Sequence, residues 1–129
     1  MIDSLSKEAI LAREHAYCRY SSFAVGAALL TKSGKVYTGA NIENVSFGAT
    51  ICAERVAIYK AIFDGERDFV AIAIAGGSKD VDFTSPCGIC RQVLTEFCDK
   101  DFKIILTNGK EDKVFKLGEL IPLSFDTIK

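Results

Sequence analysis

The apolar positions of this chain change their spacing several times, and each change marks an expected element. Residues 3–17 place small and apolar side chains at helical spacing, which predicts a helix. Residues 23–31 are apolar and small, residues 35–42 alternate more, and Ser33-Gly34 stands between them. This arrangement predicts a β-hairpin, followed by a polar loop at residues 41–50.

The second half of the chain alternates helical segments with short apolar ones. Residues 51–63 suit a helix, and residues 69–75 form a continuous apolar run typical of a strand covered on both faces. Another helix is expected from Cys87, with short strands at residues 103–106 and 114–115. Because strands separated by helices need crossover connections, we expect an α/β fold, a three-layer α/β/α sandwich around a mixed five-stranded sheet.

Composition indicates one folded domain and argues against several functional classes. Of the 129 residues, 49% are hydrophobic, which is enough for a core. The 16 basic and 17 acidic residues give a net charge of -1, whereas nucleic-acid-binding proteins usually carry a basic surface. The chain has no apolar run of about 18 residues and no N-terminal basic region followed by an apolar stretch. We therefore expect no membrane span, no signal peptide and a cytoplasmic location.

Five cysteines, an odd number, argue against a disulfide framework. Cys87 and Cys90 stand three residues apart at an expected helix start, a spacing compatible with a redox pair, half of a zinc site or two buried thiols. Cys52 stands near the start of another expected helix. Three thiolates at two helix N-termini can converge on one zinc ion, because a helix N-terminus lowers a thiol pKa. Three protein ligands would leave one tetrahedral position open, as in catalytic zinc sites.

Other potential ligands lack a paired spacing. The single histidine, His15, is interpreted as a partly solvated helix residue. Cys18 and Cys98 are interpreted as buried thiols.

Glu54 follows Cys52 by two residues, so it can lie beside a metal without binding it. Zinc lowers the pKa of a bound water, and a neighbouring carboxylate can accept that proton and return it to a substrate. An arbitrary helix glutamate is usually only solvated. This one stands between an expected ligand and Arg55, which favours a role as general acid and base.

The motifs CAER at residues 52–55 and SPCGICRQ at residues 85–92 resemble the signature of zinc deaminases. With YSSFAVGAA at residues 20–28 and NIEN at residues 41–44, they resemble the small homotetrameric cytidine deaminases over nearly the whole chain. The resemblance implies one zinc-dependent deaminase domain over residues 1–129, with one zinc ion per chain and active sites shared between subunits. It implies that cytidine, and also 2′-deoxycytidine, is deaminated to uridine or deoxyuridine and ammonia in pyrimidine salvage.

The resemblance also assigns roles to residues outside the metal site. It implies that Asn41 and Glu43 bind the ribose and that Phe23 contacts the pyrimidine. Phe125 resembles an aromatic residue that a neighbouring subunit contributes to the pocket. The backbone N–H of Ala53 is expected to hold either the C2 oxygen of the ring or the oxygen at the zinc.

An arginine beside the expected zinc ligands can change the Lewis acidity of the metal. Zinc with three thiolates is formally negative, and a guanidinium that donates to a thiolate sulfur restores its Lewis acidity. The resemblance assigns this role to Arg55, whereas Arg91 is a lesser candidate that can equally be a surface charge. Phe47 stands where many members of the family carry tyrosine, and it lacks the hydroxyl group.

Other functions fit parts of the pattern. A blasticidin-type antibiotic deaminase shares the CAE and PCGxCRQ motifs, but Asn41 and Glu43 favour a nucleoside. A non-catalytic zinc-binding domain would need a fourth ligand and would have no use for Glu54. The charge balance and the short chain argue against a deaminase of DNA or RNA.

Overall fold

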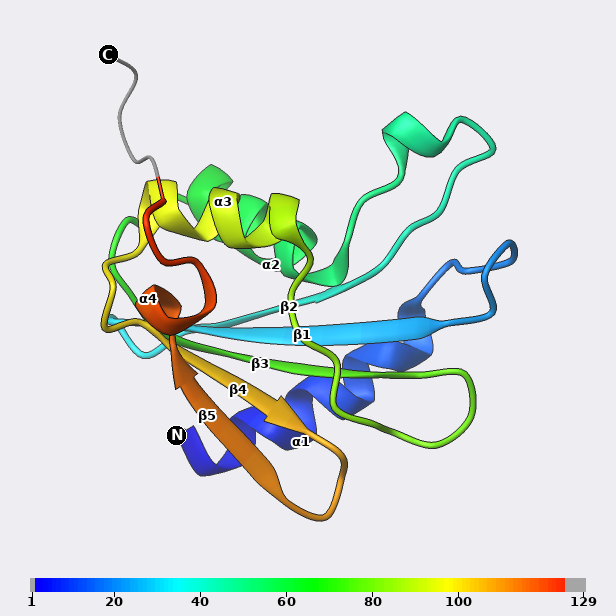
Figure 1. The fold of residues 1–129 in the computed structure, drawn as a ribbon, viewed down its shortest axis with the longest axis horizontal. Coiled ribbons are helices and arrows are strands. Elements are labelled where there is room, and N and C mark those ends of the chain that lie inside the picture. The colour runs from blue at the N-terminus through cyan, green and yellow to red at the C-terminus, as the bar shows by residue number, and fades with distance from the viewer. Residues whose placement is uncertain (1, 125–129) are drawn as a thin grey trace.

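The computed structural model describes residues 2–124, which form a five-stranded sheet with helices on both faces (Figure 1). The strands are β1 (Ala24–Thr31), β2 (Val36–Ala40), β3 (Phe69–Gly77), β4 (Lys103–Thr107) and β5 (Asp112–Lys116). Their order in the sheet is β2-β1-β3-β4-β5. Only β3 and β4 pair in parallel, and the other three pairs are antiparallel. The predicted mixed sheet is confirmed.

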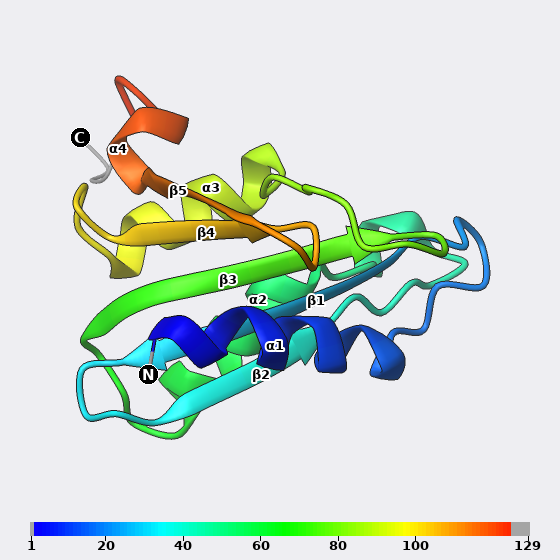
Figure 2. The same ribbon diagram turned by 90° about the horizontal axis from the view of Figure 1, so that it is seen from below.

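The helices divide between the two faces of this sheet. They are α1 (Ile2–Ala12), α2 (Ala53–Phe63), α3 (Gly88–Phe97) and the short α4 (Leu117–Leu120). Helix α1 covers one face, and α2 and α3 cover the other, which confirms the three layers (Figure 2). Helix α4 was not predicted, because four residues are too few to show a helical period. Within residues 2–124, no helix has the length and apolar character needed to cross a bilayer.

Strand β3 shows why a continuous apolar run lies at the centre of the fold. Successive side chains of a strand point to opposite faces. Ile72 and Ile74 therefore pack beneath α2 and α3, whereas Ala71, Ala73 and Ala75 pack against α1. All five are fully buried. The small alanines leave room for α1, while the larger isoleucines fill the space under two helices.

Helix α1 ends earlier than its pattern predicts. The expected helix ran to about residue 17, but α1 ends at Ala12 and a 3₁₀ turn, η1 (Arg13–His15), follows it. The Arg13 guanidinium donates to the carbonyls of Ala24 at 3.4 Å and Gly77 at 2.7 Å. After this turn the Tyr17 N–H donates to the Asn41 carbonyl at 2.9 Å and the Tyr17 carbonyl accepts from the Glu43 N–H at 2.7 Å, so these backbone groups are not available to a longer helix.

Glycine 39 allows α2 to lie against β2. A Cβ atom on Gly39 would be 2.4 Å from the Ala53 carbonyl oxygen and 2.7 Å from the Ala57 nitrogen. Because such contacts force backbone to move, we expect Gly39→Ala to lower the free energy of unfolding by about 1–3 kcal/mol. Gly48→Ala is the matched control, since a Cβ there meets no atom within 4 Å. Urea denaturation of both variants at one protein concentration tests this, and equal stabilities would contradict it.

Candidate active site

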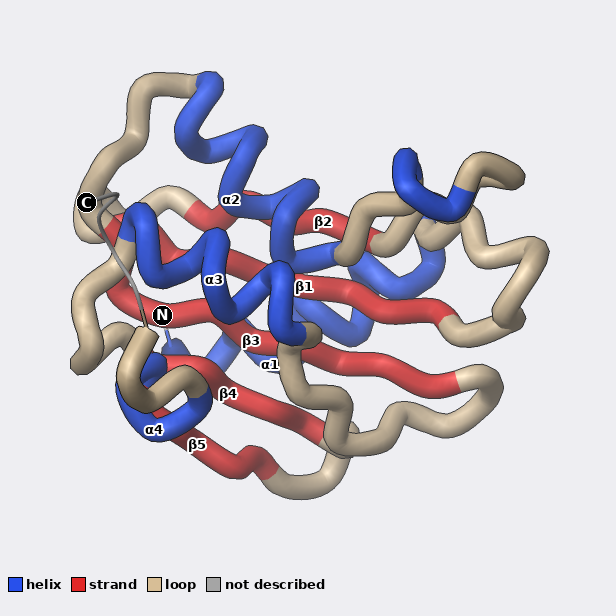
Figure 3. The backbone as a smooth tube through the Cα atoms, turned by 45° about the horizontal axis from the view of Figure 1, so that its top comes forward, coloured by secondary structure: helices blue, strands red, loops and turns tan. Residues whose placement is uncertain are grey.

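Two helix N-termini bring the three predicted zinc ligands together. Cys52 is the N-cap residue of α2, Cys87 is that of α3, and Cys90 lies in the first turn of α3. Helices α2 and α3 lie side by side on one face of the sheet (Figure 3). The Cys87 sulfur is 3.7 Å from that of Cys52 and 3.3 Å from that of Cys90. Tetrahedral zinc with Zn–S bonds of about 2.3 Å holds sulfur atoms roughly 3.8 Å apart, so the cluster fits this ion.

The two N-cap cysteines are held differently. The Cys87 sulfur accepts a hydrogen bond from the Cys90 N–H at 3.4 Å, which fixes it over the start of α3. The buried Pro86 precedes it and restricts the approach of the chain. The Cys52 side chain makes no capping hydrogen bond with α2. Its sulfur is therefore available to face the other two.

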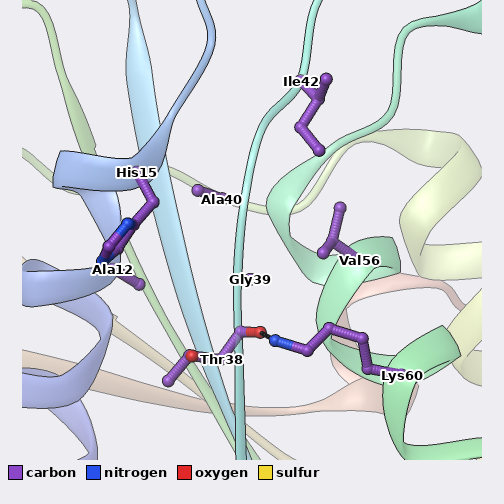
Figure 4. A pocket seen from close by; sticks show the side chains of 8 residues that line it. All are labelled: Ala12, His15, Thr38, Gly39, Ala40, Ile42, Val56 and Lys60. Atoms are coloured by element: carbon purple, nitrogen blue, oxygen red, sulfur yellow. Dashed lines mark hydrogen bonds between the residues drawn. The ribbon is translucent and has the colours of Figure 1, made fainter.

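Within the described residues, the cluster contains three potential metal ligands. Within residues 2–124, no further histidine, cysteine or carboxylate joins the three sulfur atoms. Cys18 and Cys98 are half-buried elsewhere, and burial, together with the charge of Asp99, raises the pKa of Cys98 to about 12. His15 is exposed and lines a different pocket, with His15 and Lys60 on opposite sides of β2 (Figure 4).

Electrostatics favour ionisation of Cys52. Hydrogen bonds with the Cys90 thiol, with Arg55 and with Cys87 together lower the pKa of Cys52 to about 5, against the effect of burial. Arg55 Nη2 donates to the Cys52 sulfur at 3.5 Å. The hydrogen bond with Cys52 raises the pKa of Cys90, because it favours the protonated thiol as donor, and burial raises it further. Burial opposes the charge of Arg55, but its hydrogen bonds with the sulfur atoms prevail and raise its pKa.

Glu54 is buried in the first turn of α2, with 4% of its surface exposed. Burial raises its pKa to about 7, and the negative charge of Cys52 acts in the same direction. Hydrogen bonds with its own backbone and with Cys90, and the charge of Arg55, oppose these effects. A carboxyl group whose pKa lies near neutral can both accept and release a proton during a reaction.

A cavity of about 320 Å³ joins the cysteine cluster to other predicted site residues. This volume lies in the range of small-molecule sites. The predicted residues on its wall are Phe23, Asn41, Glu43, Cys52, Ala53, Glu54 and Cys87. Cys90 and Arg55 are not among the residues that line the cavity, and Phe125 lies outside the described residues.

The cavity wall also contains residues to which sequence analysis gave no role. These are Ser21, Val25, Thr50, Ile51, Thr84 and Ser85. Four of them stand one to three residues before the predicted ligands Cys52 and Cys87, so proximity to a ligand in the sequence was a usable signal. Ser21 belongs to the YSSF motif, but its contacts depend on a distant segment of the chain.

Asn41 connects the end of β2 to the start of β1. Its Oδ1 accepts from the Val25 N–H at 2.8 Å, and its Nδ2 donates to the Phe23 carbonyl at 2.9 Å. Phe23 itself is 38% exposed at the cavity and is not a buried core residue. Asn41 thus supports the start of β1 and Phe23, which directly precedes it, and still keeps one amide hydrogen for a ligand.

Glu43 is held by the turn before β1. Its Oε1 accepts from the N–H groups of Tyr20 at 2.9 Å and Ser21 at 3.1 Å, and its Oε2 accepts from the Ser21 hydroxyl. The hydroxyl is the main cause of a lowered pKa of Glu43, and the two N–H groups add to it against the effect of burial. The carboxylate is therefore ionised and fixed in orientation.

Arg91 has a different environment from Arg55. It donates to the carbonyls of Pro86 at 2.8 Å and Leu120 at 2.7 Å, and to the Ser85 hydroxyl at 3.1 Å. It thus ties the segment before Cys87 to the end of α4. The interpretation of Arg91 as a plain surface charge is wrong, and among these contacts none is to a ligand sulfur.

Comparisons with known proteins agree with this geometry. Residues 2–106 match the family model "Cytidine and deoxycytidylate deaminase zinc-binding region". The chain is 52% identical to the cytidine deaminase of Halalkalibacterium halodurans over 94% of this chain and 91% of that protein. It superposes on the crystal structure of cytidine deaminase from Burkholderia pseudomallei with a TM-score of 0.89 and 42% identity, covering 97% and 99% of the two chains. The blasticidin-S deaminase of Bacillus cereus is 37% identical over 78% of this chain and 76% of that protein.

Metal analysis tests the cluster. We expect about one zinc ion per chain, and we expect Cys87→Ala to lose it, because two sulfur ligands hold zinc far more weakly than three. Cys18→Ala is the matched control, since this thiol lies outside the cluster. Elemental analysis after gel filtration gives the zinc content. Full zinc retention by Cys87→Ala would contradict the assignment.

Proposed function

Since the chain belongs to the family of cytidine and deoxycytidylate deaminases with a zinc-binding region, we propose that it hydrolyses cytidine, and also 2′-deoxycytidine, to uridine or deoxyuridine and ammonia. The supporting observation is one cavity that joins the cysteine cluster and the buried Glu54 to Asn41 and Glu43. We propose that residues 1–129 form one deaminase domain.

Cys52, Cys87 and Cys90 would hold the zinc ion through their sulfur atoms. Zinc with three protein ligands keeps an open position, where it acidifies water and so supplies the nucleophile of the hydrolysis. Arg55 donates to the Cys52 sulfur and so withdraws negative charge from the ligand set. The same contact fixes the orientation of Cys52.

Glu54 would carry protons between water and substrate. Its carboxylate accepts a proton from water as the oxygen bonds to C4 of the pyrimidine, and it delivers that proton to N3. It then takes the remaining hydroxyl proton and passes it to the C4 amino group, so that the C–N bond breaks and ammonia leaves. Its pKa near neutral suits both directions of transfer.

The other cavity residues would bind the nucleoside. Phe23 offers a partly exposed ring to the pyrimidine, and the N–H of Ala53, at the start of α2, has no partner within the helix. This N–H can hold the C2 oxygen or the reacting oxygen. Asn41 has one free N–H and Glu43 one free acceptor position. Together they suit a sugar hydroxyl that donates to Glu43 and accepts from Asn41.

An ultraviolet assay of the purified protein tests this function. We expect turnover of cytidine and deoxycytidine and little turnover of blasticidin S. Glu54→Gln should keep zinc and fold but lower kcat at least about 100-fold, because it cannot transfer protons. Glu8→Gln, an exposed glutamate of α1, is the matched control. Near-normal turnover by Glu54→Gln would remove Glu54 from the mechanism, and turnover of blasticidin S alone would favour an antibiotic deaminase.

We further propose a homotetramer whose active sites are completed across subunit boundaries. Val45 is 79% exposed and Phe47 is 74% exposed, on the loop between the cavity residues Glu43 and Thr50. Phe63 at the end of α2 is 95% exposed. A neighbouring chain that covered the loop would bury apolar surface and close the cavity at the same time.

Truncation tests the shared site. Deletion of residues 123–129, which include Phe125, should leave the zinc in place. It should lower activity, because Phe125 of a neighbouring chain would no longer contribute to the cavity. Deletion of residues 127–129 alone is the control. Zinc content, turnover and light scattering are measured for both and for the full chain. A fully active monomer at assay concentration would contradict the proposal.

A further inference from the structure

One hydroxyl group in the turn before β1 connects two of the proposed substrate contacts. Ser21 Oγ donates to Glu43 Oε2 and accepts from the Phe23 N–H at 3.0 Å. The Ser21 N–H also donates to Glu43 Oε1 at 3.1 Å. Ser21 lines the same cavity as both partners. The Ser21 side chain thus holds the Glu43 carboxylate, which is proposed to bind the sugar. It also holds the backbone of Phe23, whose ring is proposed to contact the base.

The backbone of this turn is in a conformation that needs support. Ser22 has a φ of 59°, in the left-handed region that residues with a side chain seldom adopt. The Ser22 N–H donates to the Cys18 carbonyl at 2.8 Å. Ser21 holds the N–H of Phe23, and Asn41 holds its carbonyl at 2.9 Å. Side-chain hydrogen bonds on both sides of Phe23 therefore stabilise the turn.

We propose that Ser21 is a positioning residue for nucleoside binding, which acts by orienting the Glu43 carboxylate and the Phe23 backbone toward the substrate. This inference rests on the proposed function. A carboxylate has about four acceptor positions, and the turn fills three of them. The fourth stays free for a substrate hydroxyl. Without the Ser21 hydroxyl, Oε2 loses its donor, and binding must order the carboxylate as well.

The contacts of Ser21 predict an effect on substrate binding and not on the chemical step. The hydrogen bonds of its side chain run to Glu43 and Phe23, and not to a ligand cysteine or to Glu54. Loss of the hydroxyl should therefore raise KM more than it lowers kcat. A serine that only stabilised the fold would instead change stability and leave KM unaffected.

Two substitutions with a matched control test the proposal. We expect Ser21→Ala to raise KM for cytidine about tenfold, the size of one hydrogen bond to a charged group, with kcat within about threefold of wild type. Ser21→Thr keeps the hydroxyl and should restore KM. In Ser33→Ala a serine loses a similar contact with a carboxylate, Glu66, at 3.1 and 3.2 Å, in the β1–β2 turn at the opposite end of β1. Its KM should not change.

A double-mutant cycle tests whether Ser21 acts through Glu43. In the Glu43→Ala background, Ser21→Ala should change kcat/KM less than it does in the wild-type background, because the carboxylate is absent and only the contact with the Phe23 N–H remains to be lost. Full additivity of the two substitutions would show that Ser21 acts independently of Glu43 and would overturn the inference.

Zinc content and the midpoint of thermal unfolding are measured for every variant. Unchanged KM in Ser21→Ala, with normal wild-type turnover, would overturn the role of Ser21 and leave the proposed function in place. A raised KM that Ser21→Thr does not restore, with loss of zinc or a lower midpoint, would reduce Ser21 to a structural residue. A wild-type protein that deaminates neither nucleoside would overturn both proposals.

Discussion

Three sulfur atoms within 4.8 Å of one another cannot all be negative unless positive charge faces them, and the structure is arranged around this constraint. Two helix N-termini and the Arg55 guanidinium provide part of that charge. The hydrogen bond with the Cys90 thiol and the contact with Arg55 lower the pKa of Cys52, whereas the pKa of Cys90 is raised. A divalent cation would complete the balance, and the cluster could hold one.

This charge arrangement depends on close packing of α2 against the sheet. The buried face of α2 consists largely of alanines, Ala53, Ala57 and Ala61, and Gly39 of β2 lies directly beneath it. Small residues on both surfaces set the height of α2 above the sheet. The same packing buries Glu54 beside the sulfur atoms, so that burial, which forms the core, also raises the pKa of the proposed proton carrier.

The cavity residues combine structural and chemical roles. Asn41 and Glu43 bind the backbone of the segment before and within β1, and each keeps hydrogen-bonding capacity toward the cavity. A binding site built in this way is ordered before the substrate arrives, which lowers the entropy lost on binding.

The sequence by itself determined the mixed five-stranded sheet and the metal cluster. Continuous apolar runs and helical periods indicate which positions of a single element are buried. The same pattern indicates where each helix begins, and the N-cap cysteines lie at these positions. The tertiary structure alone decided where α1 stops, that Arg91 ties Leu120 to the segment before Cys87, and that Ser21 meets Glu43. These features are hydrogen bonds between segments far apart in the chain. They leave no period in the sequence, because each depends on how the folded elements meet.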